Sequence, residues 1–166
     1  MLGRALLASR ATVDQRLVRA KRALAASGVG YEVPKRYELA ERLQGVLETL
    51  YLIFNEGYRT TDEPDLLRSG LCHEAIRLVR TVERSFRDEP EVLGLLALML
   101  LHASRMTSRI DEAGEFVPLE AQDRSRWNRG YIREGKLLVH KAIRRATLGP
   151  YQIQAAISLV HCEAPS

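Results

Sequence analysis

The sequence predicts an all-α protein, and three observations support this prediction. Hydrophobic residues make up 46% of the 166 residues but aromatic residues only 6%, and a core of Leu, Ala, Val and Ile suits packed helices better than a β-sandwich. Apolar residues recur at three- and four-residue steps along most of the chain. Five of the six prolines fall at intervals of 26 to 32 residues, at breaks between these stretches, which implies one long helix per interval.

The first expected element is a helix that begins just after Ser9. On a helical wheel, Leu17, Ala20 and Leu24 fall within about forty degrees of Val13 and form a narrow apolar stripe. Upstream, the segment LGRALLA predicts a short helical piece, and Ser9 in the intervening turn is placed to cap the longer helix. The order helix, tight turn, helix is typical of a helix-turn-helix.

The later helices follow from the same periodicity. Their expected ranges are 37–55 (closed by Gly57), 64–86, 88–109, 122–147 and a last helix from Pro150. The 88–109 segment is apolar almost all the way round, so we expect that helix to be the central, most enclosed one. Residues 109–124 lose the periodicity and contain Gly114 and Pro118, which predicts a loop with a short extended turn. Together these elements predict an irregular array of antiparallel helical hairpins, similar to tetratricopeptide repeats but with longer helices.

The basic residues of the chain are concentrated at its N-terminal end. Residues 1–36 carry eight Lys and Arg against two acids, whereas residues 37–166 carry seventeen against nineteen. On the wheel, the polar side of the first long helix presents Thr12, Gln15, Arg19 and Arg22, and Arg16 lies on its flank. Early polar side chains of such a helix can reach base edges in the major groove, and later arginines can meet phosphates. The alternative is an ordinary amphipathic surface helix.

Several sequence blocks resemble one protein family. The segment ATVDQRLVRAKRAL resembles the recognition helix in region 4 of bacterial RNA polymerase sigma factors of the extracytoplasmic-function (ECF) type. The blocks YLIFNEGY, LCHEAIRLVR, LGLLALMLLHASR, LEAQDRSRWNR and GPYQIQAAIS resemble the subgroup with a tetratricopeptide-like C-terminal extension. These blocks occur in order and cover nearly the whole chain.

The resemblance implies a transcription initiation factor that binds promoter DNA and the RNA polymerase core. Residues 1–27 would be the end of region 4, residues 28–36 a Gly- and Pro-containing linker, and residues 37–166 the helical extension, which would regulate activity or bind a regulatory protein. In this mapping Thr12, Gln15, Arg16 and Arg19 read the −35 element, and Asp14 could accept from a cytosine amine. Region 2 and the first helices of region 4 are absent, so we expect a fragment or a truncated reading frame.

The apolar stripe of the basic helix raises an expectation about assembly. Without the missing helices of region 4, Val13, Leu17 and Leu24 need another surface, so we expect this helix to pack on the extension or to form a homodimer. The rival to the sigma-factor interpretation is a helical protein-interaction scaffold whose basic helix packs on protein and does not bind DNA.

Two further groups of residues are candidate sites. Asn55, Glu56 and Tyr58 could form a polar ligand shelf, although Asn and Gly after an apolar stretch are also ordinary helix-stop signals. The second group is expected to form a structural or partner-binding network, and its members are Asp123, Arg124, Arg126 and Trp127. We expect Asp123 to cap a helix and Trp127 to anchor it in the core. The two arginines are expected to pair with acids such as Glu56 or Glu74.

Other classes of function find little support. No nucleophile has an adjacent base, so we do not expect an enzyme. Cys72–His73 and His161–Cys162 lack the two-to-four-residue ligand spacing of zinc sites, and no glycine loop could hold a phosphate, so no metal or cofactor is expected. The longest apolar run, residues 92–101, is about half of what a bilayer requires. With only two distant cysteines and no signal peptide, we expect a cytoplasmic protein without a membrane partner.

Overall fold

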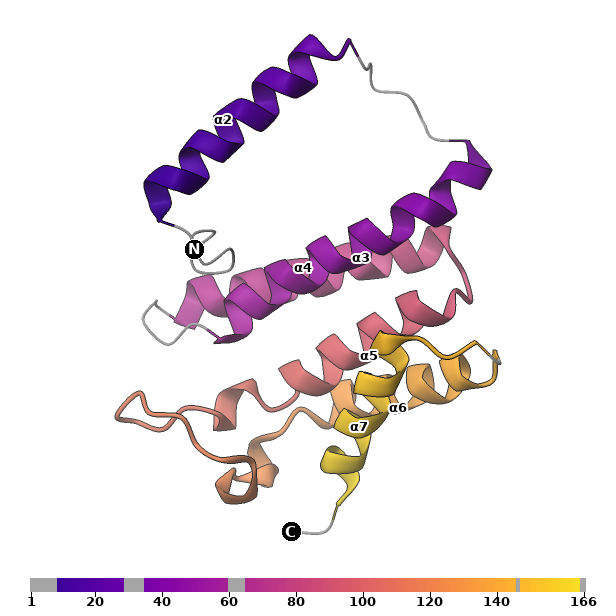
Figure 1. Ribbon diagram of the computed structural model, residues 1–166. Helices are drawn as coiled ribbons and strands as arrows, with labels where there is room; N and C mark the ends of the chain where they lie inside the picture. Colours follow the sequence, from indigo (N-terminus) through magenta and orange to yellow (C-terminus); the bar gives the residue numbers. More distant parts are fainter. Residues whose placement is uncertain (1–8, 29–34, 60–64, 146, 165–166) are drawn as a thin grey trace. The chain divides into compact units, whose positions relative to one another are not determined.

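The computed structural model describes residues 9–28, 35–59, 65–145 and 147–164 (Figure 1). In these ranges the regular secondary structure is helical, apart from one isolated antiparallel bridge between Ile110 and Phe116. The all-α prediction is therefore confirmed. The chain forms two units, residues 1–48 and residues 49–166, and helix α3 (Arg36–Arg59) contributes to both.

The first unit contains helix α2 (Arg10–Ala26), the expected basic helix. Its N-cap is Ser9, whose hydroxyl oxygen accepts from the backbone N–H of Thr12 at 3.2 Å, as the sequence predicts. Of the apolar stripe, Val13 is buried, whereas Leu17 and Leu24 are 43% and 65% exposed. The expected upstream helix (residues 1–8) and most of the expected linker (residues 29–34) lie outside the described residues, and the three-part division of the chain stays a prediction.

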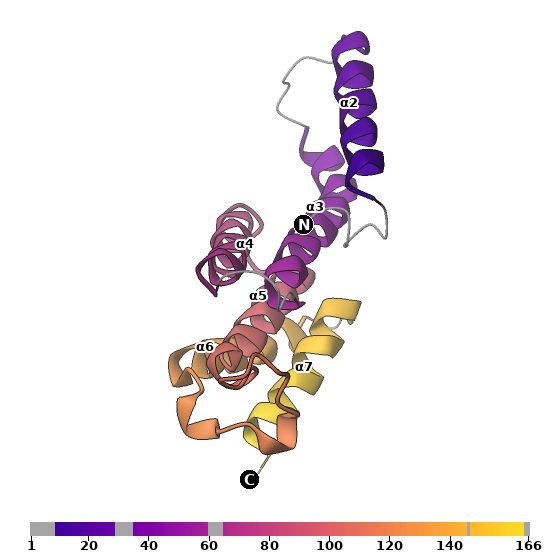
Figure 2. The ribbon, with the colours of Figure 1, turned by 90° about the vertical axis from the view of Figure 1, so that its left-hand side faces the viewer.

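The second unit is built around helix α5 (Pro90–Ala103), in which eleven of fourteen residues are buried. Helices α4 (Asp65–Ser85), α6 (Arg129–Ile143) and α7 (Pro150–Glu163) all pack against it (Figure 2). The prediction that this apolar helix is the central one is confirmed. Pro90 and Pro150 stand at the first positions of α5 and α7, where proline costs no backbone hydrogen bond.

Helices α5 and α7 approach each other closely because their contact includes a glycine. A Cβ atom on Gly94 would lie 2.7 Å from the backbone nitrogen of Gln152, so a larger side chain does not fit there. One turn earlier in α5, the Glu91 carboxylate accepts from the backbone N–H groups of Tyr151 and Gln152, both at 3.2 Å. Glu91 thus caps the N-terminus of α7 with a negative charge, as the helix dipole favours.

Two predicted helix ends are wrong, at Gly57 and after Ala103. Helix α3 does not stop at Gly57 but continues to Arg59, because Tyr58 is buried and packs against neighbouring rings, and such packing outweighs a local stop signal. Helix α5 ends at Ala103 and does not run to residue 109. The buried hydroxyl of Ser104 donates to the Leu101 carbonyl at 2.7 Å, and a 3₁₀ turn follows.

The helix expected over residues 122–147 is also shorter than predicted. Asp123 accepts from the backbone N–H of Ser125 and starts a separate 3₁₀ turn. Asn128 then accepts from the Tyr131 N–H at 3.0 Å, and α6 begins only after it. Two short polar side chains therefore divide the segment, since each offers the backbone an alternative to the continuous helix.

The glycine contact between α5 and α7 can be tested by substitution. We expect Gly94→Ala to lower the free energy of unfolding of the 49–166 unit by ~1–3 kcal/mol, because the added methyl collides with the α7 backbone. The matched control is Gly70→Ala on the exposed side of α4, where nothing lies within 4 Å, and it should stabilise by ~0.5–1 kcal/mol. Urea unfolding followed by the fluorescence of the single tryptophan, Trp127, measures both, and equal effects would contradict the close contact.

Candidate functional site

The candidate DNA-reading residues lie on α2 and are exposed. Gln15, Arg16, Arg19 and Arg22 all face solvent, so their polar groups are not used up in a protein core. Thr12 is also exposed, but its hydroxyl hydrogen-bonds the Ser9 hydroxyl at 2.8 Å and belongs to the helix cap. The structure therefore leaves Gln15 and the arginines as the side chains with the most freedom to contact a nucleic acid.

The Asn55, Glu56 and Tyr58 group does not form an exposed ligand shelf. Asn55 and Glu56 are half-buried, and Tyr58 is buried. The Tyr58 ring stacks on the ring of His102, with centroids 5.1 Å apart, and on that of Phe54, at 5.5 Å. The Arg109 guanidinium lies 3.6 Å from the Tyr58 ring centroid and also donates to the Tyr58 carbonyl. This stacked cluster anchors the segment after α5 on the end of α3.

Burial favours the uncharged forms of Tyr58 and His102 in this cluster and of the two cysteine thiols, Cys72 and Cys162. It raises the pKa of the Tyr58 hydroxyl and raises that of the Cys72 thiol to about 12. It also raises the pKa of the Cys162 thiol, and it lowers the pKa of His102 to about 3. A thiolate is the reactive form of cysteine, so neither thiol is activated as a nucleophile at neutral pH. The cluster is therefore best explained as packing and not as a catalytic centre.

A long irregular segment connects α5 to α6 and is held at both ends. The backbone N–H of Asn128 donates to the Ser104 carbonyl at 2.7 Å, which closes residues 104–128 into a loop. Three 3₁₀ turns lie inside it, η1 (Met106–Ser108), η2 (Leu119–Ala121) and η3 (Arg124–Arg126). A loop of this length is uncommon in a small domain and is usually functional when it is ordered.

Side-chain hydrogen bonds fix the shape of this loop. The Thr107 hydroxyl donates to the Arg126 carbonyl at 3.1 Å and so joins η1 to η3. The Asp111 Oδ1 atom accepts from the N–H groups of Ala113 and Glu115, both at 2.9 Å, in the turn where Gly114 has a positive φ of 86°. The Gln122 amide donates to the Val117 carbonyl at 2.9 Å. The predicted short extended turn is present as the Ile110–Phe116 bridge.

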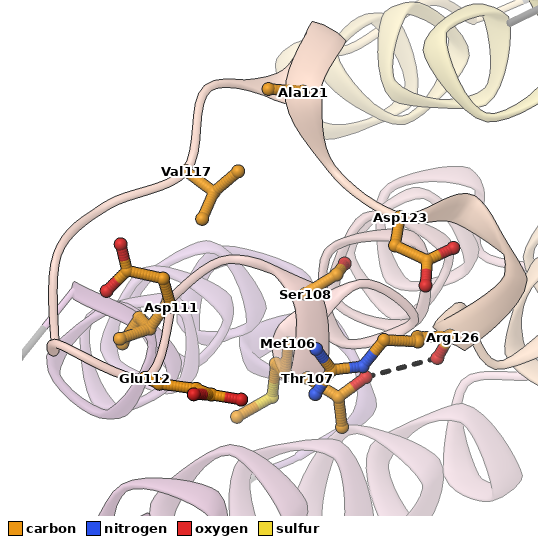
Figure 3. A pocket seen from close by; sticks show the side chains of 10 residues that line it. Met106, Thr107, Ser108, Asp111, Glu112, Val117, Ala121, Asp123 and Arg126 are labelled. Carbon is orange, nitrogen blue, oxygen red and sulfur yellow. Dashed lines mark hydrogen bonds between the residues drawn. The ribbon is translucent and has the colours of Figure 1, made fainter.

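The loop borders a pocket of about 530 Å³ that is partly open to solvent. Figure 3 shows Asp111 and Glu112 on one side of this pocket and Asp123 and Arg126 on the other. The other lining residues are two hydroxyls and four apolar side chains, namely Thr107, Ser108, Met106, Ile110, Val117 and Ala121. Its volume lies within the usual range for small-ligand sites, ~300–1,000 Å³.

The predicted network at residues 123–127 is divided between the pocket and its support. Asp123 and Arg126 line the pocket. Trp127 is buried at 3% exposure, as expected, and the Arg124 guanidinium lies 4.9 Å from its ring centroid. Arg124 also donates to the Ala164 carbonyl at 2.6 Å, so it ties the loop to the C-terminal end of α7.

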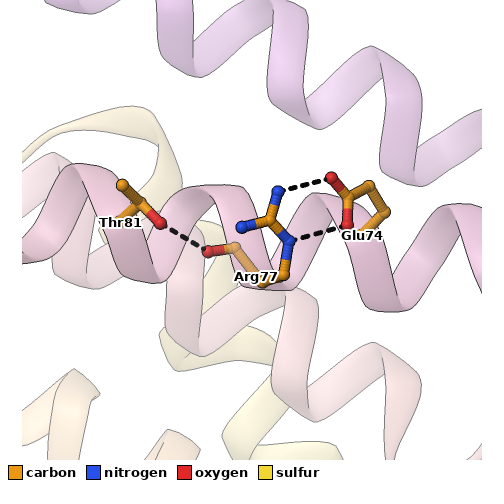
Figure 4. A network of polar contacts seen from close by, with 3 residues as sticks. All are labelled: Glu74, Arg77 and Thr81. Carbon is orange, nitrogen blue, oxygen red and sulfur yellow. Dashed lines mark hydrogen bonds and ion pairs between the residues drawn. The ribbon is translucent and has the colours of Figure 1, made fainter.

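The expected ion pair between these arginines and Glu74 is not formed. Glu74 instead accepts two hydrogen bonds from Arg77 on the same helix, at 2.7 and 2.8 Å (Figure 4). The Thr81 hydroxyl donates to the Arg77 carbonyl at 3.2 Å. The pair holds the pKa of the Glu74 carboxyl below its usual value, but both side chains are at least half exposed, and such surface pairs stabilise a protein little.

The pocket itself was not anticipated from the sequence, although the sequence contains a signal for it. Residues 110–123 carry five acids and no Lys or Arg, within a chain whose formal charge is +4. The pocket also depends on turns that place Asp111 and Glu112 opposite Asp123, and a one-dimensional pattern does not specify such a meeting. Among the described residues, no three His, Cys, Asp or Glu side chains lie close enough together to hold a metal ion.

Comparison with known proteins places the chain in a family. Residues 42–143 match a family of unknown function, DUF6596, and the chain belongs to this family. It is 47% identical over 163 residues to Uncharacterized protein R00370 of Rhizobium meliloti (strain 1021). That alignment covers 98% of this chain but 38% of the relative, so the chain spans well under half of that protein's length. No solved structure matches the chain significantly. No helix within the described ranges is long and apolar enough to cross a membrane.

The neutral state of His102 predicts a pH dependence of stability. Its folded pKa of about 3 lies below the ordinary value of 6.5, so the unfolded chain binds the proton more tightly. Stability should therefore fall as the pH decreases from about 6.5 towards 3, with a contribution from this group of up to ~1.4 kcal/mol per pH unit. We expect His102→Gln to flatten this acid branch, measured by urea unfolding at a series of pH values. Ser158→Ala, which removes only the hydroxyl bonded to His102 at 3.2 Å, should leave the slope unchanged.

Proposed function

We propose that this chain is the C-terminal part of a bacterial sigma factor that directs RNA polymerase to promoters. In this proposal α2 is the helix that reads the −35 element, and the helical unit 49–166 regulates activity or binds a partner. The observation that carries the proposal is the exposed basic face of α2, where Gln15, Arg16, Arg19 and Arg22 are all open to solvent.

The electrostatics of α2 favour a polyanion as its ligand. Between Ala11 and Arg22 it carries Arg16, Arg19, Lys21 and Arg22 against the single acid Asp14. Cations that bind phosphates release condensed counterions from DNA, which makes the affinity high at low salt and strongly dependent on salt. The cap at Ser9 fixes where the helix begins and therefore which side chains lie in its first turns.

The length of the Rhizobium meliloti relative is compatible with this proposal. A chain that spans 38% of the relative's length leaves room there for the sigma-factor regions that are absent from residues 1–166. The unit 49–166, with its buried α5 and its ordered loop, supplies a folded platform of a kind that suits protein binding. Polymerase and a regulatory protein are the partners that the proposal names.

A helical scaffold without DNA binding is the second candidate. It is favoured by the exposed apolar side chains of α2, since Leu17, Val18 and Leu24 are 43%, 46% and 65% exposed. Such side chains suit a contact with another protein, including a second copy of the chain. A scaffold needs no discrimination among DNA sequences. Sequence-specific binding is therefore the property that separates the two candidates.

The DNA proposal can be tested by binding to a duplex that carries a −35-type element. We expect the affinity to fall steeply as the salt concentration rises. Arg16→Gln and Arg19→Gln should each reduce the slope of log K against log salt concentration by about one where the side chain contacts a phosphate. Substitution of Gln15 by Ala should relax the preference for one base, with a loss of ~1–3 kcal/mol in discrimination. Fluorescence anisotropy at several salt concentrations measures these effects.

The matched control is Arg133→Gln, which removes the same charge from an exposed position on α6. It should change the affinity little, because α6 is not part of the proposed reading surface. Equal losses for the α6 and α2 variants, or identical binding to a scrambled duplex, would contradict the proposal and favour the scaffold.

A further inference from the structure

The pocket in the 104–128 loop is built to keep its shape without a ligand. Its two halves are joined by the Thr107–Arg126 hydrogen bond, and the Asp111 turn holds the side that carries Glu112. Behind it, Trp127 is buried and Arg124 fastens the loop to α7. A preformed cavity loses little conformational entropy when it binds a ligand, so even a few contacts can give measurable affinity.

The lining of the pocket combines an apolar surface with an excess of negative charge. Met106, Ile110, Val117 and Ala121 supply the apolar part. Three acidic residues, Asp111, Glu112 and Asp123, line the pocket together with one basic residue, Arg126. A hydrogen bond from Ser125, which is the larger effect, and the nearby charge of Arg126 hold the pKa of the Asp123 carboxyl below its usual value, so this group stays ionised at neutral pH.

The carboxylates do not converge in the way that a metal ion requires. Among the residues that the structure describes, no three acidic, His or Cys side chains form a possible metal site. Carboxylates distributed around a partly apolar pocket match a larger organic cation, whose charged end meets them while its carbon chain contacts Met106 and Val117.

We propose that this pocket binds a cationic group on an aliphatic stem, the chemistry of an arginine or lysine side chain. The stem lies against the apolar residues, and the cation lies beside the carboxylates that line the pocket. The residues that line it are not those of the proposed DNA-reading face, and this proposal does not depend on that face. A basic segment of another protein and a free basic metabolite are two sources of the same chemistry.

Arg126 offers a sharp test of the proposal, because its positive charge repels a bound cation and so lowers the affinity. Its backbone carbonyl holds Thr107, but its side chain lines the pocket. Arg126→Gln keeps the backbone contact and removes the positive charge. It should therefore strengthen the binding of a cation by about threefold or more, as the Coulomb energy at this range allows after screening by salt. A purely structural role of Arg126 predicts no such gain.

The test is an NMR titration of the full chain with N-acetyl-L-argininamide, observed at the Met106, Ile110 and Val117 methyl groups. We expect saturable shifts of these methyls, and no comparable binding of N-acetyl-L-citrullinamide, which has the same shape without the charge. Asp111→Asn combined with Glu112→Gln should weaken binding about tenfold. The Asn side chain retains the oxygen that caps the turn, so the loop should keep its fold.

The control for non-specific attraction is Glu120→Gln. Glu120 lies in η2 of the same loop, is exposed and does not line the pocket. Its loss should leave the affinity almost unchanged. Equal binding of the citrulline analogue, an effect of Glu120→Gln as large as that of the pocket variant, or the absence of saturable shifts would each overturn the proposal.

The two sources of the cation are distinguished by free L-arginine. If the pocket binds a free amino acid, the α-carboxylate of that ligand can pair with Arg126. Free arginine then binds more tightly than the acetylated amide. If the pocket serves a protein segment, the amide binds at least as well, and a peptide with one central arginine binds better still. Either result supports the cation site, and together they identify its source.

Discussion

The close contact between α5 and α7 is the constraint on which the structure of the 49–166 unit depends. It requires a glycine at position 94, because any side chain there would meet the backbone at Gln152. It also positions Glu91 to cap the first turn of α7. With α7 fixed on α5, the C-terminal end of α7 becomes an attachment point for Arg124, and so the shape of the long loop depends indirectly on the same helix pair.

Much of this fold could be predicted because the decisive signals are local. Pro90 and Pro150 mark helix starts, Ser9 caps α2, and a fully apolar run identifies the central helix. The predicted helix ends were wrong where tertiary contacts or short polar side chains determine where a helix begins or ends. Tyr58 carries α3 past a glycine because its ring is stacked in the core, and Asn128 starts a new helix inside a periodic stretch. Periodicity measures amphipathic character, and it does not register these competing interactions.

The candidate sites differ in how far the sequence could indicate them. The α2 face could be predicted, because charge and spacing on one helix determine which side chains share a side. The pocket could not, because it is formed by three 3₁₀ turns and an isolated bridge that bring Asp111 and Asp123 to one cavity. The two sites also have opposite charge, so a polyanion suits the first and an organic cation the second.

Hydrogen–deuterium exchange of the full chain with and without a −35-type duplex tests the functional account most directly. The account predicts that the amides of α5 exchange most slowly in both states, because that helix is enclosed, and that the duplex slows exchange in α2 while the 104–128 loop is unchanged. Protection by DNA in the loop or elsewhere in the 49–166 unit, with α2 unaffected, would contradict it.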